Sequence, residues 1–363
     1  KLTRASNFLY SWHNLCLGLR INKLYLEVLM KALLCKEFGS PETLSYEEID
    51  DPVLKDGYVV VDIHSASVNF PDVLMIQDKY QFKPPLPFSP GGESSGVISE
   101  IGNGVEEFNQ GDRVIVSSGW GSFAEKILVE PSTLTKIPDQ MDHNTAASFL
   151  MTYGTSHHAL KNRANIKQGE SLLVLGAAGG VGLAAVELGK AMGAKVIAAA
   201  SSDEKLTICK EHGADETLLY PSGPMDRNHQ KKLSEDIKVL TDAQGADVVY
   251  DPVGGDYAEP ALRATAWEGR YLVVGFAAGD IPKIPLNLAL LKGCQIVGVF
   301  WGAFKGREAK LHNENVIELI KLYEDGYLKP HISSIYSLEE GAKAISDLEQ
   351  RKAKGKVVVQ VKT

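Results

Sequence analysis

The run Ser171–Gly182, SLLVLGAAGGVG, constrains the fold of this chain more than any other segment. An apolar stretch stops at a cluster of small residues and then resumes with helical spacing, which predicts a strand, a tight turn and a helix. Gly179 lets backbone approach a diphosphate, Gly182 lets the helix pack on the strand, and the helix N-terminus offers N–H groups to phosphate oxygens. Because Ala177 replaces the first glycine of the usual G-x-G-x-x-G motif, a purely steric glycine turn is the alternative.

The residues after this turn complete a βαβ unit and bear on the choice of cofactor. A helix is expected at 181–192 and a second strand at 194–200. NAD-binding units usually end that strand with an acidic residue, whereas this chain has Ser202 close by and Lys205 shortly after it. A carboxylate at this point would repel the 2′-phosphate of NADPH, whereas the Ser202 hydroxyl and the Lys205 cation would bind it. NADPH is therefore expected rather than NADH. A merely solvated Lys205 stays open, because two acidic residues stand between it and Ser202.

Composition and charge narrow the class of protein. The 363 residues, 44% hydrophobic and 23% charged, leave room for two domains with a substantial core. A net charge of -8 disfavours nucleic-acid binding, and no apolar run approaches the roughly 18 residues that a membrane span needs. The cysteines, Cys16, Cys35, Cys209 and Cys294, show no metal or disulfide spacing and are expected to be reduced thiols. Small-molecule chemistry in an intracellular setting follows.

Residues 1–29 differ from the rest in charge. They carry four basic residues and only one acidic residue, Glu27. An acid-poor leader of this kind is compatible with an organelle transit peptide, which would make the protein mitochondrial. The alternative, a non-essential extension before Met30, leaves it cytoplasmic, and this is the expectation adopted.

The pattern of the remaining chain changes near residue 150. From residue 30 to about 129, short β segments alternate with turn residues, which predicts a β-barrel or sandwich unit, and the proline-rich stretch 84–92 predicts a rigid loop. Helical spacing over 142–160 is followed by strands at 171–175, 194–200, 216–219, 247–250, 270–274 and 295–300. Helices between them are expected at 181–192, 203–212, 229–243 and 257–266, so the whole reads as a doubly wound parallel sheet.

Many short segments together resemble the medium-chain dehydrogenase/reductase superfamily, and within it the zinc-independent quinone oxidoreductases related to zeta-crystallin. The segments that carry the resemblance are VNFPDVL, KYQFKPPLPFSPGGE, GDRV, GSFAEKILV, MTYGTSHHAL, LGAAGGVGLAA, ASSDEKL, YDPVGGD, GRYLVVGF and GKVVV. The resemblance implies an α/β protein with a GroES-like β-barrel catalytic domain and a Rossmann domain. The catalytic domain would comprise 30–152 and 303–363, and the NADPH-binding domain 153–302.

The chain departs from the zinc-dependent branch of that superfamily. Asn69 and Gly92 stand where that branch has zinc ligands, and the four-cysteine loop expected after GDRV is absent from the sequence. No metal is therefore expected, and hydride transfer needs an acceptor that is already electrophilic. A quinone or an α,β-unsaturated carbonyl meets that need, with the cofactor supplying the chemistry and the protein supplying orientation and dipoles.

On the acceptor side, the resemblance implies that Tyr80, Asn69 and Asp72 line the cleft near the nicotinamide, with Tyr80 hydrogen-bonding the carbonyl or enolate oxygen. Each has an ordinary structural alternative: Tyr80 as a half-buried aromatic residue, and the other two as turn residues. Leu74 stands where some relatives carry tyrosine, so the proton donor stays open, and solvent is one candidate.

On the cofactor side, the resemblance implies contacts along the whole dinucleotide. The expected residues are Thr152, Ala177, Ala178, Gly179, Gly180, Val181, Ser202, Lys205, Tyr220, Val253, Gly275, Phe276, Phe300, Gly302 and Lys356. Packing alone is the alternative for Tyr220, Phe276 and Phe300. The neighbouring His157 and His158 are expected at the surface, because adjacent helical residues point apart.

The function expected from the sequence is therefore an NADPH-dependent quinone or enone reductase. The alternatives are a crystallin-like protein that binds NADPH with little turnover and an enoyl-thioester reductase that shares the mechanism. The resemblance also implies a homodimer in which the strand 295–300 pairs across a two-fold axis, and the apolar IVGVF run is compatible with a buried sheet edge.

Overall fold

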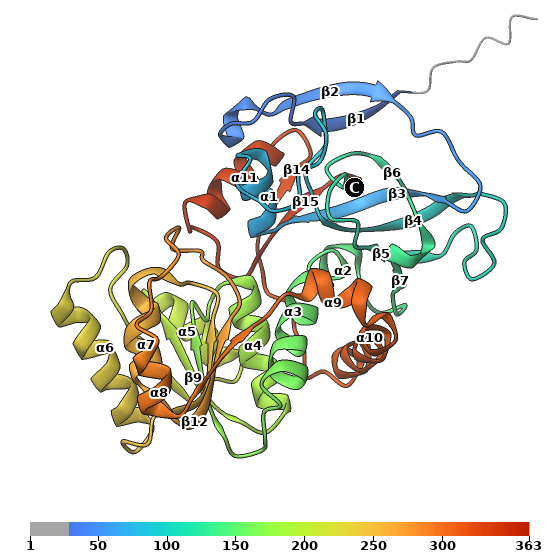
Figure 1. Ribbon diagram of the computed structural model, residues 1–363. Helices are drawn as coiled ribbons and strands as arrows, with labels where there is room; N and C mark the ends of the chain where they lie inside the picture. Colours follow the sequence, from blue (N-terminus) through green and yellow to red (C-terminus); the bar gives the residue numbers. More distant parts are fainter. Residues whose placement is uncertain (1–28, 363) are drawn as a thin grey trace, which may run out of the picture.

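A computed structural model describes residues 29–362 of the protein, and its ribbon shows two main bodies joined by several chain crossings (Figure 1). The lower body in that view contains a six-stranded sheet, and the upper body contains a seven-stranded sheet with a two-stranded hairpin beside it. The expectations for residues 1–29 and for Cys16 fall almost entirely outside the described residues. Within residues 29–362 no helix combines the length and the apolar character that crossing a membrane requires.

The six-stranded sheet is parallel throughout and has the order β10-β9-β8-β11-β12-β13. Its strands are β8 (Ser171–Leu175), β9 (Lys195–Ala200), β10 (Glu216–Leu219), β11 (Ala246–Asp251), β12 (Thr265–Val273) and β13 (Gln295–Gly298). The chain starts at the middle strand and moves outward in both directions. This arrangement confirms the predicted doubly wound parallel sheet.

Helices cover both faces of this sheet, and alternation along the strands explains the two buried faces. Leu172 and Val174 of β8 belong to the core shared with α4 (Gly180–Ala191) and α5 (Asp203–Glu211). The intervening strand residues belong to the core shared with α6 (Arg227–Leu240) and α7 (Ala258–Arg263).

One predicted helix is shorter than expected. The helix predicted at 257–266 ends at Arg263, because Thr265 already begins β12 and pairs with Ala246 of β11. The strand predicted at 270–274 is accordingly longer, and it starts at Thr265.

The seven-stranded sheet forms the barrel-like unit. Its order is β14-β15-β3-β4-β5-β7, with β6 paired to β3. The strands are β3 (Val59–Val68), β4 (Glu93–Ile101), β5 (Arg113–Val116), β6 (Lys126–Val129), β7 (Leu134–Lys136), β14 (Ile332–Ser337) and β15 (Lys356–Gln360). The separate hairpin pairs β1 (Leu29–Leu34) with β2 (Ser45–Asp50). The C-terminal strand β15 therefore returns to pair with β3, which brings the end of the chain to the barrel.

The segment predicted as helical at 142–160 contains wider turns than an α-helix. After α2 (His143–Ala146), the π-helical turns η3 (Leu150–Gly154) and η4 (His158–Arg163) flank the short α3 (Thr155–His157). His157 is 0% exposed and His158 6%, so the expected surface position of both is wrong. The His158 ring stacks on Phe304 at 3.9 Å, and this packing buries it.

Further helices complete the fold. They are α1 (Phe70–Ile76), α8 (Asn287–Lys292), α9 (Trp301–Arg307), α10 (Ala309–Glu324) and α11 (Gly341–Glu349), with 3-10 turns η1 (Pro41–Thr43), η2 (Pro131–Thr133) and η5 (Gly255–Tyr257). In Figure 1, α9 and α10 lie below β5 and β7, on the side where the two bodies meet.

Candidate functional site

The glycine-rich turn between β8 and α4 has little space for side chains. Gly176 has a φ of +59°, a value that favours glycine. A Cβ on Gly182 would lie 2.3 Å from the Gly176 carbonyl oxygen, so the approach of α4 to β8 requires glycine there. Gly179 is the N-cap of α4 and Gly180 its first residue, which leaves the first N–H groups of the helix without partners inside it. The sequence comparison looked for the first glycine of the motif at position 177 and found alanine. The residue with the positive φ in this turn is Gly176, which that comparison missed.

Tyr220 supports this turn from inside the protein. It is 7% exposed, and its hydroxyl accepts a hydrogen bond of 3.0 Å from the Gly176 N–H. Its ring lies 4.8 Å from that of Tyr257. Burial raises the pKa of the Tyr220 phenol, so it stays neutral. The Tyr220 hydroxyl thus lies against the turn, while its backbone N–H donates to the Ala200 carbonyl at 3.0 Å, at the end of β9.

A group of basic side chains gathers at the carboxyl end of β9. Ser202 is the N-cap of α5, and its hydroxyl accepts from the Lys205 N–H at 3.3 Å. The Lys205 amino group lies 3.5 Å from the Ser201 hydroxyl. Its pKa is lowered by burial and by two further cations, Lys354 and Arg351.

Those two cations reach the site from the segment between α11 and β15. Lys354 pairs with Glu204, and Arg351 donates to the Ala278 carbonyl at 3.0 Å. Three positive groups therefore gather beside the acidic residues Asp203 and Glu204, so positive charges outnumber negative ones here. Sequence reasoning missed Arg351 and Lys354, because only the return of the C-terminal segment brings them near α5.

The same C-terminal segment docks on the glycine turn. Gly355 donates to the Ala178 carbonyl at 2.7 Å and forms a β-bridge with Gly179. A Cβ on Gly180 would lie 3.1 Å from both Lys356 and Thr152. The structure thus brings Ala178, Gly179, Gly180, Thr152 and Lys356 together, although they come from distant parts of the sequence.

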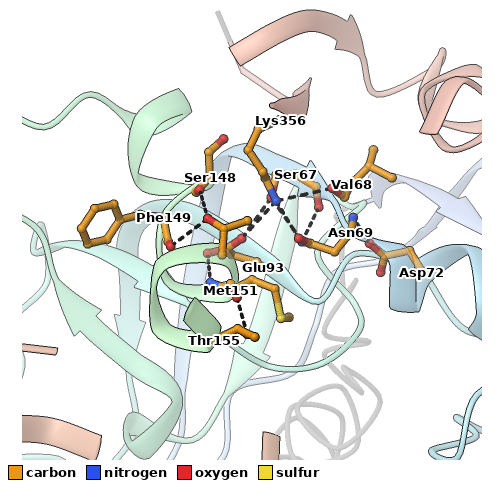
Figure 2. A network of polar contacts seen from close by, with 11 residues as sticks. Ser67, Val68, Asn69, Asp72, Glu93, Ser148, Phe149, Met151, Thr155 and Lys356 are labelled. Carbon is orange, nitrogen blue, oxygen red and sulfur yellow. Dashed lines mark hydrogen bonds and ion pairs between the residues drawn. The ribbon is translucent and has the colours of Figure 1, made fainter. Parts of the chain in front are cut away.

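Lys356 is buried in a polar network between the two bodies, which Figure 2 shows from close by. It is 5% exposed, and its amino group donates to the Asn69 side-chain oxygen at 2.6 Å. The Glu93 carboxylate, 0% exposed, lies 3.6 Å away and accepts from Ser67 at 3.1 Å and from the Met151 N–H at 2.8 Å. Burial lowers the pKa of Lys356 and raises that of Glu93, while each charge opposes the shift of the other. The network joins β3, β4 and β15 to the turn that carries Thr152.

Asn69 and Asp72 form the start of α1 and take part in this network. The Asp72 carboxylate accepts from the Asn69 N–H at 2.7 Å and from the Gly91 N–H at 3.1 Å. Asp72 is fully buried, which raises its pKa to about 6 although these hydrogen bonds and Lys356 oppose the rise. The polar atoms of both side chains are thus engaged with the protein itself, so they fix the position of Lys356 and of the loop at Gly91.

Tyr80 lies on an aromatic wall between the loop after α1 and the end of β13. Its ring lies 6.0 Å from that of Phe82, which lies 6.1 Å from that of Phe300. Phe82 is 53% and Phe300 43% exposed, so the wall faces open space. Burial and the Asp72 carboxylate raise the pKa of Tyr80, which keeps its phenol protonated as a hydrogen-bond donor.

The loop after β11 forms another wall beside the glycine turn. A Cβ on Gly176 would lie 2.8 Å from the Val253 side chain, and Gly275 donates to the Asp251 carbonyl at 3.3 Å. The buried Asp251 carboxylate accepts from the N–H groups of Val253 and Gly254 at 2.7 and 2.9 Å. Phe276 packs beside Gly254 and is partly buried, and Gly302 lies in the first turn of α9. Asp251, missed in the sequence, positions this loop.

The described residues do not form a set of side chains that could bind a metal ion. Between residues 29 and 362 no three His, Cys, Asp or Glu side chains come together in a way that could hold a metal ion. The residues that are assembled offer a glycine-rich turn at a helix N-terminus, a positively charged corner and an aromatic wall. This combination is suited to an extended anionic ligand that meets a planar one.

Comparison with known proteins defines the class to which this fold and site belong. The alcohol dehydrogenase GroES-like domain family matches residues 55–139, and the zinc-binding dehydrogenase family matches residues 180–321. The protein from Nematostella vectensis called quinone oxidoreductase-like protein 2 homolog is 39% identical over 335 residues, which cover 92% of this chain and 89% of that protein. Human quinone oxidoreductase is 33% identical over 319 residues, covering 87% and 93% respectively.

A solved structure shows the same arrangement. A mycobacterial protein complexed with NADPH superposes with a TM-score of 0.84 at 28% identity, covering 92% of this chain and all of that one. The chain is thus an oxidoreductase of the medium-chain dehydrogenase/reductase type, with a GroES-like barrel and a nucleotide-binding domain. Within that class it belongs to the quinone oxidoreductase family.

Proposed function

We propose that the protein is an NADPH-dependent reductase that transfers hydride to a quinone or an α,β-unsaturated carbonyl without zinc. The observation that carries the choice of NADPH is the group of Lys205, Arg351 and Lys354 at the end of β9. A 2′-phosphate needs positive charge at that point, where NAD-binding units place an acidic residue. Lys354 is paired with Glu204, which leaves the other two cations for the phosphate.

The residues around the turn fit the rest of such a dinucleotide. The free N–H groups at the start of α4 would hold the diphosphate, and Gly182 allows the close approach of α4 to β8 that places them there. Lys356 would approach the phosphates from the barrel side. We assign cofactor contacts to Thr152, Ala177, Ala178, Gly179, Gly180, Val181, Ser202, Lys205, Val253, Gly275, Phe276, Phe300, Gly302 and Lys356. Tyr220 is assigned a further contact near the adenosine 2′-phosphate, which its backbone hydrogen bond to Ala200 at the end of β9 supports.

When bound, the coenzyme supplies a hydride, and the protein supplies orientation and electrostatics. We propose that Tyr80 donates a hydrogen bond to the acceptor carbonyl from the aromatic wall. Asn69 and Asp72 hold Lys356 and the neighbouring loop in place, which their contacts with backbone and with Lys356 support. The exposed rings of Phe82 and Phe300 offer a planar acceptor a stacking surface.

The direct test measures oxidation of NADPH with a quinone, an enone and an enoyl thioester in parallel. Acceptor-dependent oxidation of NADPH, faster with the quinone or the enone than with the thioester, is the expected result. Tight NADPH binding without acceptor-dependent oxidation would favour a crystallin-like binding protein, and preference for the thioester would favour an enoyl-thioester reductase. Elemental analysis of the purified protein is expected to find no stoichiometric zinc.

We also propose a homodimer that extends the six-stranded sheet through β13. This strand is at the edge of the sheet, and Ile296 on it is 40% exposed. Large apolar side chains on β12, on α8 and in the loop between them are also exposed, namely Trp267, Ile281, Leu286, Leu290 and Leu291, with fractions from 69% to 80%. Such a surface is typical of an interface. Light scattering is expected to give a dimer for the natural chain and a monomer for Ile296→Lys, and a monomeric natural chain would rule the pairing out.

Two further assignments remain proposals of the same kind. The catalytic domain would comprise 30–152 and 303–363 around the nucleotide-binding domain at 153–302. The protein would be cytoplasmic, and a fluorescent fusion with and without residues 1–29 tests this against mitochondrial import.

A further inference from the structure

Lys305 on α9 is not among the residues assigned to the cofactor or to the acceptor. Its amino group donates to the Ser117 hydroxyl at 2.8 Å and to the Ser117 carbonyl at 3.2 Å. It also lies 4.6 Å from the centre of the Trp301 ring. All of these partners are uncharged, and no ion pair within residues 29–362 includes Lys305. A partly buried ammonium without a paired carboxylate is costly unless a ligand uses its charge.

The surroundings of Lys305 point toward the substrate side of the site. It lies three residues after Gly302 on α9, so the two residues share a helix face. Phe300, the N-cap of this helix, belongs to the aromatic wall that includes Tyr80. Glu93 is the carboxylate whose charge acts on Lys305, and Glu93 also binds the Met151 N–H beside Thr152. Lys305 and Lys356 therefore act on Glu93 from α9 and β15 respectively.

The other titratable group facing Lys305 does not neutralise it. His312 of α10 has its pKa lowered to about 4 by burial and then by Lys305, so His312 is uncharged near neutral pH. Ser117 at the end of β5 supplies only neutral oxygens. Glu93 is occupied by Ser67, Met151 and Lys356. Lys305 thus keeps a positive charge that no neighbour fully balances.

We propose that Lys305 is a catalytic residue that binds the acceptor's carbonyl oxygen and gives it a proton. This inference rests on the proposed function. The acceptor takes the two electrons of the hydride into its conjugated system, which leaves a negative charge on the carbonyl oxygen, while the coenzyme is oxidised to NADP⁺. One N–H bond of the ammonium breaks as an O–H bond forms. The products are the enol or hydroquinone and a neutral amine, which regains its proton from water.

Lys305 is better matched to this proton transfer than Tyr80. Burial lowers the pKa of Lys305 to about 8, against the smaller opposing effect of Glu93. Burial raises the pKa of Tyr80 instead, so its phenol can donate a hydrogen bond but releases a proton poorly. General acids work best when their pKa lies near the working pH. The two residues would therefore divide the work at the acceptor oxygen.

The test compares Lys305→Met and Lys305→Arg with the natural chain, and uses Lys310→Met, an exposed lysine on α10, as the control. For the natural chain, kcat/KM is expected to fall above pH of about 8. Lys305→Met should lower kcat/KM about 100-fold, within the range typical of a lost general acid, and should lose that pH dependence. Lys305→Arg keeps the positive charge, but arginine does not release a proton near pH 8. This variant should therefore lower kcat more than it raises KM.

A second readout does not depend on turnover. Because Lys305 lies beside Trp301, the fluorescence of Trp301 should change as the lysine titrates and again when a quinone is added. Lys305→Met should lose both responses, and Lys310→Met should keep both. NADPH binding and thermal unfolding of each variant show whether it is folded. If Lys305→Met keeps kcat/KM within about threefold and the same pH profile, the inference is wrong. If the natural chain oxidises no NADPH with any acceptor, the proposed function itself fails.

Discussion

Replacing Lys205 with methionine tests the assignment of the 2′-phosphate site. The change removes one of three cations and leaves the Ser202 cap of α5 intact, because that cap uses the Lys205 backbone N–H. A hydrogen bond to a charged group contributes about 1.5–3 kcal/mol. Its loss should weaken NADPH binding about 10- to 100-fold. NADH lacks the phosphate, so its dissociation constant should change less than about threefold.

Calorimetric titration with each coenzyme measures both constants directly. Lys210→Met is the matched control, since Lys210 is an exposed lysine on the same helix. Arg351→Gln should behave like Lys205→Met, whereas Lys354→Met should lose less, because Lys354 is already paired with Glu204. Equal weakening of NADPH and NADH binding by Lys205→Met would refute the reasoning, and so would an unchanged affinity for NADPH.

Other predictions concern the turn, acid stability and metal content. Gly182→Ala should destabilise the protein by about 1–3 kcal/mol, because its Cβ would lie 2.3 Å from the Gly176 carbonyl oxygen. Gly306→Ala is the control and should not destabilise it, because the new Cβ would meet nothing within 4 Å. Denaturant unfolding compares the two variants. Burial lowers the pKa of His143 to about 4, so the unfolded chain binds a proton between pH 6.5 and 4 that the fold excludes. The free energy of unfolding should therefore fall as the pH drops through that window. The fall should be about 1–3 kcal/mol smaller in His143→Gln, and equal slopes of stability against pH in the two proteins would contradict this. Chelators should leave NADPH oxidation unchanged, and restoration of lost activity by added zinc would count against the metal-free proposal.

The parts of the fold that depend on local pattern could be predicted from the sequence. The strand, turn and helix from Ser171 to Ala191 follow from apolar periodicity and from glycines that few other residues could replace. The parallel order of the sheet follows because strands and helices alternate along the chain. The π-helical turns at 150–163 left no such trace, because they are short departures within a segment whose sequence pattern is helical throughout.

The parts of the site that depend on distant residues could not be predicted in this way. Lys354 meets Glu204 across 150 positions of sequence, and Lys356 meets Asn69 across 287. Nothing local in AKGKVVV indicates that Lys354 serves the end of β9 or that Lys356 is buried beside Glu93. The burial of His157 and His158 was missed for a related reason, since α9 and α10 cover a helix face that looks polar in isolation.

The most direct test of hydride transfer at this site uses NADPH that carries deuterium on the transferable position of the nicotinamide. The acceptor should be an enone, and mass spectrometry should follow the label after a single turnover. The expected product is the saturated carbonyl compound, which carries one deuterium on its β-carbon. A product without deuterium, or a label that remains entirely with the coenzyme, would contradict it.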